Sequence, residues 1–360
     1  MSAAVAELPR ETGAGGNLFA QQEANRKASR RLVAGFVLFL AWLGFGGDFI
    51  WYLASRDGAT GTGVHIFPGV GILLTAIAGA MTWFAFRFGP VSLIKGTGAR
   101  EIETPSTENE QRLVNVVEEM AIAAGTRKPH IWLVPEAAPN AFATGIEAEN
   151  AHVAVTEGLL ETCNREELQA VVAHEMGHIV NLDVKLMTLL TALVGVVAVV
   201  HNSAFRVMRF GGGGRGRSRS NNKGSGAGGV LAIVLLVVWI ISWLIAPLVT
   251  RYMAMKVGRS REFLADAMSA QFTRNPAALA EALTKIGAST VKPTAIPKSS
   301  AQLCIADPFH SAWDERKGKF ADLMATHPPL SDRVGRLREM AYQGAAAGEI
   351  LHNPLIMSEA

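Results

Sequence analysis

The sequence predicts an α+β protein, mainly helical, in which a soluble domain with a small β-sheet is fused to transmembrane helices. Two apolar segments near the N-terminus, Leu32–Tyr52 and Val64–Phe86, are each long enough to cross a hydrocarbon core of about 30 Å as helices. After the second segment, helical patterns with capping residues alternate with short runs typical of strands. The 360 residues are enough for one globular domain and several spans.

The first apolar segment is predicted to be an uncleaved membrane anchor. It follows a polar tail, residues 1–31, and is longer than the apolar region of a signal peptide, which is roughly 7 to 15 residues. Asp48 lies near its far end, beside Trp51 and Tyr52, which favours a carboxylate at the membrane interface over an intramembrane proton relay.

Basic residues flank the two spans on the side away from their connecting loop, which carries only Arg56. The flanking residues are Arg26, Lys27, Arg30, Arg31, Arg87, Lys95 and Arg100. By the positive-inside tendency, the tail and the chain after Phe86 are expected in the cytoplasm. The net charge of +3 is explained by these flanks and does not favour nucleic acid as a partner.

The soluble part begins with a helix capped by Thr107 and Glu110 and ended by Gly125. Three strand-like runs follow, at His130–Val134, Ala141–Ile146 and His152–Thr156. The last run directly precedes the next helix, so its backbone is a candidate for pairing with an extended peptide; the alternative is an interior strand. Cys163 and Cys304 provide no disulfide framework and are expected to be reduced, partly buried thiols.

Two further apolar stretches, Leu186–Val200 and Val230–Leu248, interrupt the soluble domain. A linker rich in Gly and Arg, residues 202–228, separates them and is predicted to be disordered. Either both stretches cross the bilayer or they form a re-entrant hairpin. The predicted organisation is therefore a tail (1–31), two spans (32–86), the first half of the soluble domain (87–185), the apolar pair (186–249), the second half (250–345) and a C-terminal tail (346–360).

The pentapeptide HEMGH, His174 to His178, lies in a predicted amphipathic helix that starts with a capping pair, Asn164 and Glu167. Residues four apart share a helix face, so both imidazoles can bind one zinc ion at about 2.0 to 2.1 Å. Glu175 lies beside them, and its carboxylate can take a proton from an attacking water instead of ligating the ion. A chance pattern without a metal is the alternative, which the helical context disfavours.

A catalytic zinc usually takes three protein ligands and leaves one position open. The metzincin extension would place its third histidine at Val184 and is therefore excluded. Glu262 and Asp266 stand four apart on one face of a predicted later helix. Glu262 can ligate zinc while Asp266 orients an imidazole through its other ring nitrogen. A solvated helix face is the alternative.

These motifs predict a zinc-dependent peptidase with one Zn²⁺ per chain. Both motifs lie within a few helical turns of the later apolar stretches, which places the zinc within roughly 25 Å of the bilayer. The expected partners are therefore the lipid bilayer and membrane-protein or membrane-proximal substrates. The sequence sets no oligomeric state.

Four motifs occur together along the chain. They are the HEMGH helix followed by Asn181 and Asp183, the block Glu262 to Asp266, the stretch NAFATG from Asn140 to Gly145, and HPPLSDR from His327 to Arg333. With them, the chain from about Asn17 to Arg336 resembles the HtpX-type membrane zinc metallopeptidases, relatives of the CAAX prenyl endopeptidases.

The resemblance implies a gluzincin-like fold, with His174, His178 and Glu262 as zinc ligands and Glu175 as general base. It also implies proteolysis of damaged or misassembled membrane proteins at the cytoplasmic face of a bacterial inner membrane, as part of a stress response. Asp266, Asn181 and Asp183 would then support the ligands.

By the same resemblance, the NAFATG stretch and the strand after it would border the substrate groove. The residues concerned are Asn140, Ala141, Phe142, His152, Val153 and Ala154. His327 and Arg333 would support the developing oxyanion. Their alternatives are a helix-entry turn for His327 and a structural ion pair for Arg333.

Two other functions remain open from the sequence. One is a peptidase that processes prenylated proteins, which needs an intramembrane chamber built from more spans than this chain offers. The other is a membrane scaffold with a structural zinc, which needs four protein ligands where three are visible.

Overall fold

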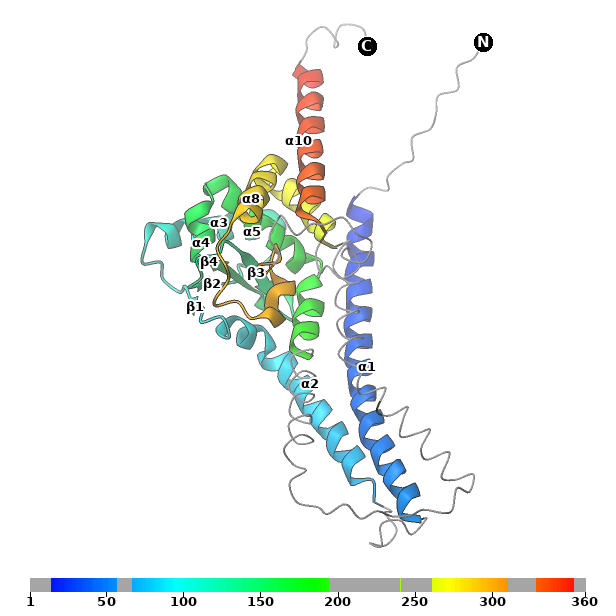
Figure 1. Cartoon of the computed structure of the whole chain (residues 1–360). Helices are drawn as coiled ribbons and strands as arrows, with labels where there is room; N and C mark the ends of the chain where they lie inside the picture. The colour runs from blue at the N-terminus through cyan, green and yellow to red at the C-terminus, as the bar shows by residue number, and fades with distance from the viewer. Residues whose placement is uncertain (1–13, 57–66, 194–239, 241–260, 310–327, 353–360) are drawn as a thin grey trace, which may run out of the picture.

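The computed structural model describes residues 14–56, 67–193, 240, 261–309 and 328–352 (Figure 1). The fold is mainly helical with one small mixed sheet, which confirms the predicted fold class. A pair of long helices extends from one side of a globular part that contains the sheet (Figure 1). The Gly- and Arg-rich linker and the apolar stretch Val230–Leu248 lie outside the described residues, apart from Ile240.

The long pair consists of α1 (Ala14–Arg56) and α2 (Gly69–Lys95), both long and apolar enough to cross a membrane. Large apolar side chains are exposed along them, as expected of a lipid-facing surface; they include Leu38, Trp42, Phe49, Leu73, Trp83 and Phe84. The helix α1 begins at Ala14, inside the segment predicted to be a polar tail. The predicted tail is therefore helical from residue 14 onward and continuous with the first span.

The buried carboxylate of Asp48 joins the two spans. It accepts hydrogen bonds from the backbone N–H of Gly71, at 2.6 Å, and of Val70, at 3.4 Å, in the first turn of α2. Gly44 and Gly71 let the backbones come close at this crossing, because a Cβ on Gly44 would lie 2.7 Å from the Gly71 Cα. Asp48 therefore caps α2.

The soluble part follows the sequence pattern closely. Helix α3 (Glu108–Ala124) is capped by the Thr107 side chain and ends at Gly125, whose φ of 67° is the left-handed conformation that glycine accepts. The strands are β1 (Arg100–Glu101), β2 (His130–Val134), β3 (Ala141–Thr144) and β4 (His152–Thr156). The remaining elements are η1 (Ala148–Asn150), α4 (Glu157–Thr162), α5 (Arg165–Val180), α8 (Pro276–Ala288), η2 (Lys298–Leu303) and α10 (Leu330–His352).

The strand order is β1-β2-β4-β3, with β2 and β4 parallel and the other pairs antiparallel. One face of the sheet joins the main core with α3, α5 and α8. The other face, which includes Trp132, Phe142 and Ala154, packs against Ile94 at the end of α2 and against Leu303. The sheet is thus buried on both faces, with the end of a membrane helix forming part of its cover.

After α5 the chain turns and continues as a helix, Asp183–Leu193, bent by 83° from α5. Leu189 and Leu193 pack in a cluster with residues of α1 and α2, such as Phe36 and Ala85. The start of the third apolar stretch therefore lies against the two spans. A third span exists among the described residues only if α5 and this helix count as one, and α5 lies in the core of the soluble part.

Candidate metal centre

The HEMGH helix, α5, is built as its sequence predicts. The Asn164 side chain accepts from the Glu167 N–H, and the Glu167 side chain accepts from the Asn164 N–H, a complete capping box. The helix then packs against a second helix over residues 261–273. Gly177 permits this approach, because a Cβ there would lie 3.3 Å from the Ala265 Cα.

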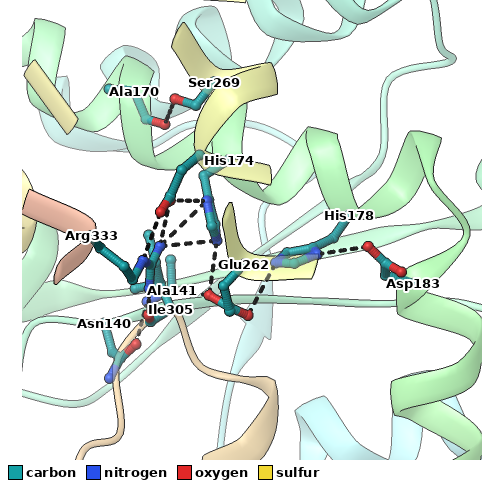
Figure 2. Close-up of polar contacts among 11 residues, drawn as sticks. Asn140, Ala141, Ala170, His174, His178, Asp183, Glu262, Ser269, Ile305 and Arg333 are labelled. Carbon is teal, nitrogen blue, oxygen red and sulfur yellow. Dashed lines mark hydrogen bonds and ion pairs between the residues drawn. The ribbon is translucent and has the colours of Figure 1, made fainter. Parts of the chain in front are cut away.

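The close approach brings three ligand-type side chains together. The Glu262 carboxylate lies between the two imidazoles, with Oε2 3.6 Å from His174 Nε2 and Oε1 3.5 Å from His178 Nε2 (Figure 2). Ligands held at about 2.0 to 2.1 Å in tetrahedral directions lie roughly 3.4 Å apart. The donor set therefore fits a zinc ion, and within the described part of the chain this group has three members.

The other ring nitrogens of both histidines are occupied by carboxylates. Asp266 Oδ1 lies 3.0 Å from His174 Nδ1, and Asp183 Oδ2 lies 3.3 Å from His178 Nδ1. Such contacts fix the ring orientation and leave Nε2 for a metal. Asn181 is fully buried and caps the end of α5, and its side-chain NH₂ donates to the Met268 sulfur at 3.1 Å.

Glu175 is 1% exposed and lies on the wall of a pocket next to the ligand group. Among the described residues, its Oε1 has no hydrogen-bond partner. Burial raises the pKa of this carboxyl above its usual value, which makes the carboxylate a stronger proton acceptor. Because this oxygen makes no hydrogen bond to the described residues, it is free to accept a proton from an attacking water.

Arg333 is the largest fully buried side chain described. Its Nε and Nη2 donate to the two oxygens of Asp266 at 2.9 and 2.7 Å, and its Nη1 donates to the Ile305 carbonyl at 2.7 Å. Nη1 also lies 3.1 Å from Glu262 Oε2. The guanidinium therefore pairs with both acidic residues of the 261–273 helix, as expected of a structural ion pair. The predicted role of Arg333 in supporting the oxyanion stays a prediction.

We expect Arg333→Met to lower the free energy of unfolding of the metal-free chain by about 3–5 kcal/mol, because it leaves two carboxylates buried without their cation. Denaturant unfolding in detergent micelles, followed by tryptophan fluorescence, measures this. The matched control is Arg338→Met, which breaks an exposed pair with Glu281 and should cost at most about 1 kcal/mol. Equal effects of the two substitutions would contradict a structural role for Arg333.

Protons compete with a metal for both imidazoles. Burial opposes the charged form of His174, but hydrogen bonds to Asp266 and Glu262 outweigh it and raise its pKa. For His178, too, burial is outweighed, here by Asp183 and Glu262, and the pKa is well above the usual value. A raised pKa keeps each ring protonated to higher pH, and zinc binds only the neutral ring.

We therefore expect zinc affinity to rise with pH through the neutral range, by up to about 100-fold per pH unit where both rings must lose a proton. Calorimetric titration in buffers of different ionisation enthalpy counts the protons released. An affinity independent of pH, with no proton release, would show that the rings are already neutral in the metal-free chain.

The predicted pairing of substrate with β4 is wrong. The strand pairs with β2 on one side and β3 on the other, so its backbone is used at His152, Val153 and Ala154. His152 also accepts a hydrogen bond from the Trp132 ring N–H at 3.2 Å, and burial lowers its pKa to about 4. The interior-strand alternative is the correct one.

The edge position next to the metal helix belongs to β3. Its outer side is partly covered by the chain itself, through a bridge between Phe142 and Cys304 and a bond from the Ile305 N–H to the Ala141 carbonyl at 2.9 Å. The Asn140 side chain donates to the Ala306 carbonyl at 2.9 Å. Ala143, further along β3, lines the pocket beside Glu175 and His178.

His327 lies outside the described residues, so its predicted role is untested. The structure adds two polar residues that the sequence analysis missed, Gln22 and Asn25 of α1. Their side-chain amides donate to the carbonyls of Val180 and Asn181, each at 2.8 Å, at the end of the HEMGH helix. Asn25 is buried and Gln22 is half-buried, but the sequence does not show burial, so no sequence signal marked either residue.

Comparison with known proteins places these observations in a family. The model of peptidase family M48 matches residues 107–341. A protease HtpX homolog from Streptococcus gordonii is 35% identical over 324 residues, covering 90% of this chain and 100% of that protein. A protease HtpX homolog from Caldanaerobacter subterraneus is 36% identical over 323 residues, covering 90% of this chain and 98% of that protein.

Among solved structures, that of S. mikatae Ste24p matches with a TM-score of 0.38 and 17% identity, covering 89% of this chain and 67% of that chain. This similarity is too low to assign a fold or a function to the chain. The family model spans most of the chain, and the HtpX homologs match almost end to end. The chain therefore belongs to peptidase family M48 and is a membrane metalloprotease.

Proposed function

We propose that this metalloprotease hydrolyses peptide bonds of damaged or misassembled membrane proteins at the cytoplasmic face of the membrane, with one zinc ion held by His174, His178 and Glu262. The observation that carries the proposal is the position of the Glu262 carboxylate, 3.5 and 3.6 Å from the two Nε2 atoms. A zinc ion at this point would supply Lewis acidity for the attacking water and the scissile carbonyl.

The remaining steps belong to side chains of the chain itself. Glu175 takes the proton of the attacking water on Oε1 and passes it to the leaving nitrogen as the C–N bond breaks. Asp266 and Asp183 keep the ligand rings oriented, and Arg333 holds Glu262 and Asp266 in place. Three protein ligands in place of four favour a catalytic site over the structural zinc of a scaffold.

The choice of membrane proteins as substrates rests on the position of the site. Asn25, which contacts the end of the metal helix, precedes Leu32 by seven residues, about 10 Å of helix. The centre is thus close to the start of the apolar part of α1. The predicted groove residues Asn140, Ala141 and Phe142 lie at the β3 edge of the sheet, which the segment at Cys304 and Ile305 partly covers. We propose that substrate binds along this edge after that segment moves aside.

The test of the proposed function is proteolysis by the purified full chain in proteoliposomes. We expect cleavage of an unfolded membrane protein that stops with a chelator and returns with added zinc. A farnesylated C-terminal peptide tests prenyl-protein processing, and its exclusive cleavage would replace the proposal. Absence of chelator-sensitive cleavage of either substrate would support a scaffold.

The cytoplasmic orientation is tested by labelling. Both native cysteines are buried, so a cysteine at exposed Lys128 gives a clean signal. We expect Lys128→Cys to resist an impermeant maleimide in whole cells and to react in inverted vesicles. The reverse pattern would place the metal centre outside the cell.

A further inference from the structure

We infer that Asn25, on the N-terminal part of the membrane helix α1, is a positioning residue for the zinc ligand His178. The inference rests on the proposed zinc centre. Asn25 is 1% exposed. Its NH₂ group donates to the Asn181 carbonyl at 2.8 Å and to Asp183 Oδ1 at 2.7 Å. The other oxygen of Asp183 lies 3.3 Å from His178 Nδ1 (Figure 2).

Among the described residues, Asn25 makes the shortest contact to the Asp183 carboxylate, at 2.7 Å. The other two partners of this carboxylate, Arg261 Nε and His178 Nδ1, each lie at 3.3 Å. A bond of 2.7 Å to a carboxylate is in the range of strong, charge-assisted bonds. The side-chain direction of Asp183, and with it the hold on the His178 ring, is therefore set largely by a residue of α1.

The turn between α5 and the next helix needs such a hold. Leu182 has a φ of 58°, a left-handed conformation that a leucine rarely adopts. The two bonds of Asn25 fall on Asn181 and Asp183, on either side of this residue. The conformation is thus maintained by contacts with α1 and not by local preference.

A primary amide suits this position. It offers two hydrogens on one nitrogen, and both are used, one on a carbonyl and one on a carboxylate. An aspartate would supply no donor in its charged form and would set a second negative charge against Asp183. The anchor helix therefore contributes a polar group to the support of the metal site, in addition to holding the protein in the membrane.

The test compares two substitutions of similar shape in the full chain, purified in detergent. Asn25→Leu removes the amide that donates to Asp183. Gln22→Met removes the neighbouring amide, which donates to the Val180 carbonyl and not to Asp183. We expect Asn25→Leu to weaken zinc binding by about 10- to 100-fold, the usual cost of losing an outer partner of a ligand. Gln22→Met should leave it within about threefold.

A spectroscopic readout separates positioning from simple docking of α1. In the Co²⁺-substituted protein, Asn25→Leu should shift the visible absorption bands, while Gln22→Met should not. If Asn25 acts through Asp183, it should also add no further loss of zinc affinity in an Asp183→Ala background. Additive losses, or equal effects of Asn25→Leu and Gln22→Met, would overturn the inference.

Two further measurements keep the outcomes apart. The unfolding midpoint of the metal-free chain shows whether Asn25→Leu still folds, and Asn25→Ser serves in its place if it does not. If Asn25→Leu leaves the zinc affinity and the cobalt spectrum unchanged, while proteolysis by the wild type depends on zinc, the inference is refuted and the proposed function is not. A wild type that binds zinc but cleaves nothing would refute the proposed function alone.

Discussion

Glu175→Gln should retain one zinc per chain and lose peptide hydrolysis by about 100- to 10,000-fold, the usual contribution of a general base. The substitution keeps the shape of the side chain but removes the group that accepts the proton of the attacking water. Glu175 is not among the ligand-type residues that gather around Glu262. Zinc content by elemental analysis and cleavage of an unfolded membrane protein measure the two quantities separately.

The control for this prediction is Glu161→Gln, a change of the same chemistry at an exposed position on α4. It should leave both zinc content and turnover unchanged. Turnover of Glu175→Gln equal to that of the control would remove Glu175 from the mechanism. Loss of zinc together with activity would instead make Glu175 a ligand.

Glu262→Gln should weaken zinc binding by more than about 100-fold and abolish proteolysis, because it removes the only anionic ligand of the predicted set. Asp266→Asn should have a smaller effect on zinc affinity, about 10- to 100-fold, since Asp266 acts through the His174 ring. Competition with a chromophoric chelator measures both constants.

The exposed Glu281→Gln is the matched control for Glu262→Gln, and it should bind zinc as the unaltered chain does. Which of the two site variants loses more zinc affinity decides which carboxylate is the ligand. A larger loss of zinc affinity for Asp266→Asn than for Glu262→Gln would exchange the roles assigned to these two carboxylates.

Local patterns in the sequence predicted most of the elements that carry the centre. The capping pair of Asn164 and Glu167 placed the start of α5, and Gly125 placed the end of α3, because these residues act on neighbours within one turn. Glu262 was predicted as a ligand from the chemistry of a third ligand, since spacing along the chain does not specify a partner more than 80 residues away. The structure brings Glu262 next to both histidines, and its role as a ligand stays a prediction.

The errors have a common physical cause, which is that tertiary neighbours are not encoded locally. The β4 sequence HVAVT is buried at all five positions, and such a run is typical of an interior strand. Its place between β2 and β3 nevertheless depends on the order of the strands in the sheet, which the pattern of apolar residues along one strand does not predict. Asn25 likewise has no local signature, since its partners lie 156 and 158 residues further along the chain.

The most direct test of the zinc centre is anomalous diffraction at the zinc absorption edge from crystals of the full chain. We predict one peak per chain, bonded at about 2.0 to 2.2 Å to His174 Nε2, His178 Nε2 and a Glu262 oxygen, with the remaining position not filled by protein. A peak elsewhere, or a fourth protein ligand at this ion, would contradict the catalytic zinc centre described above.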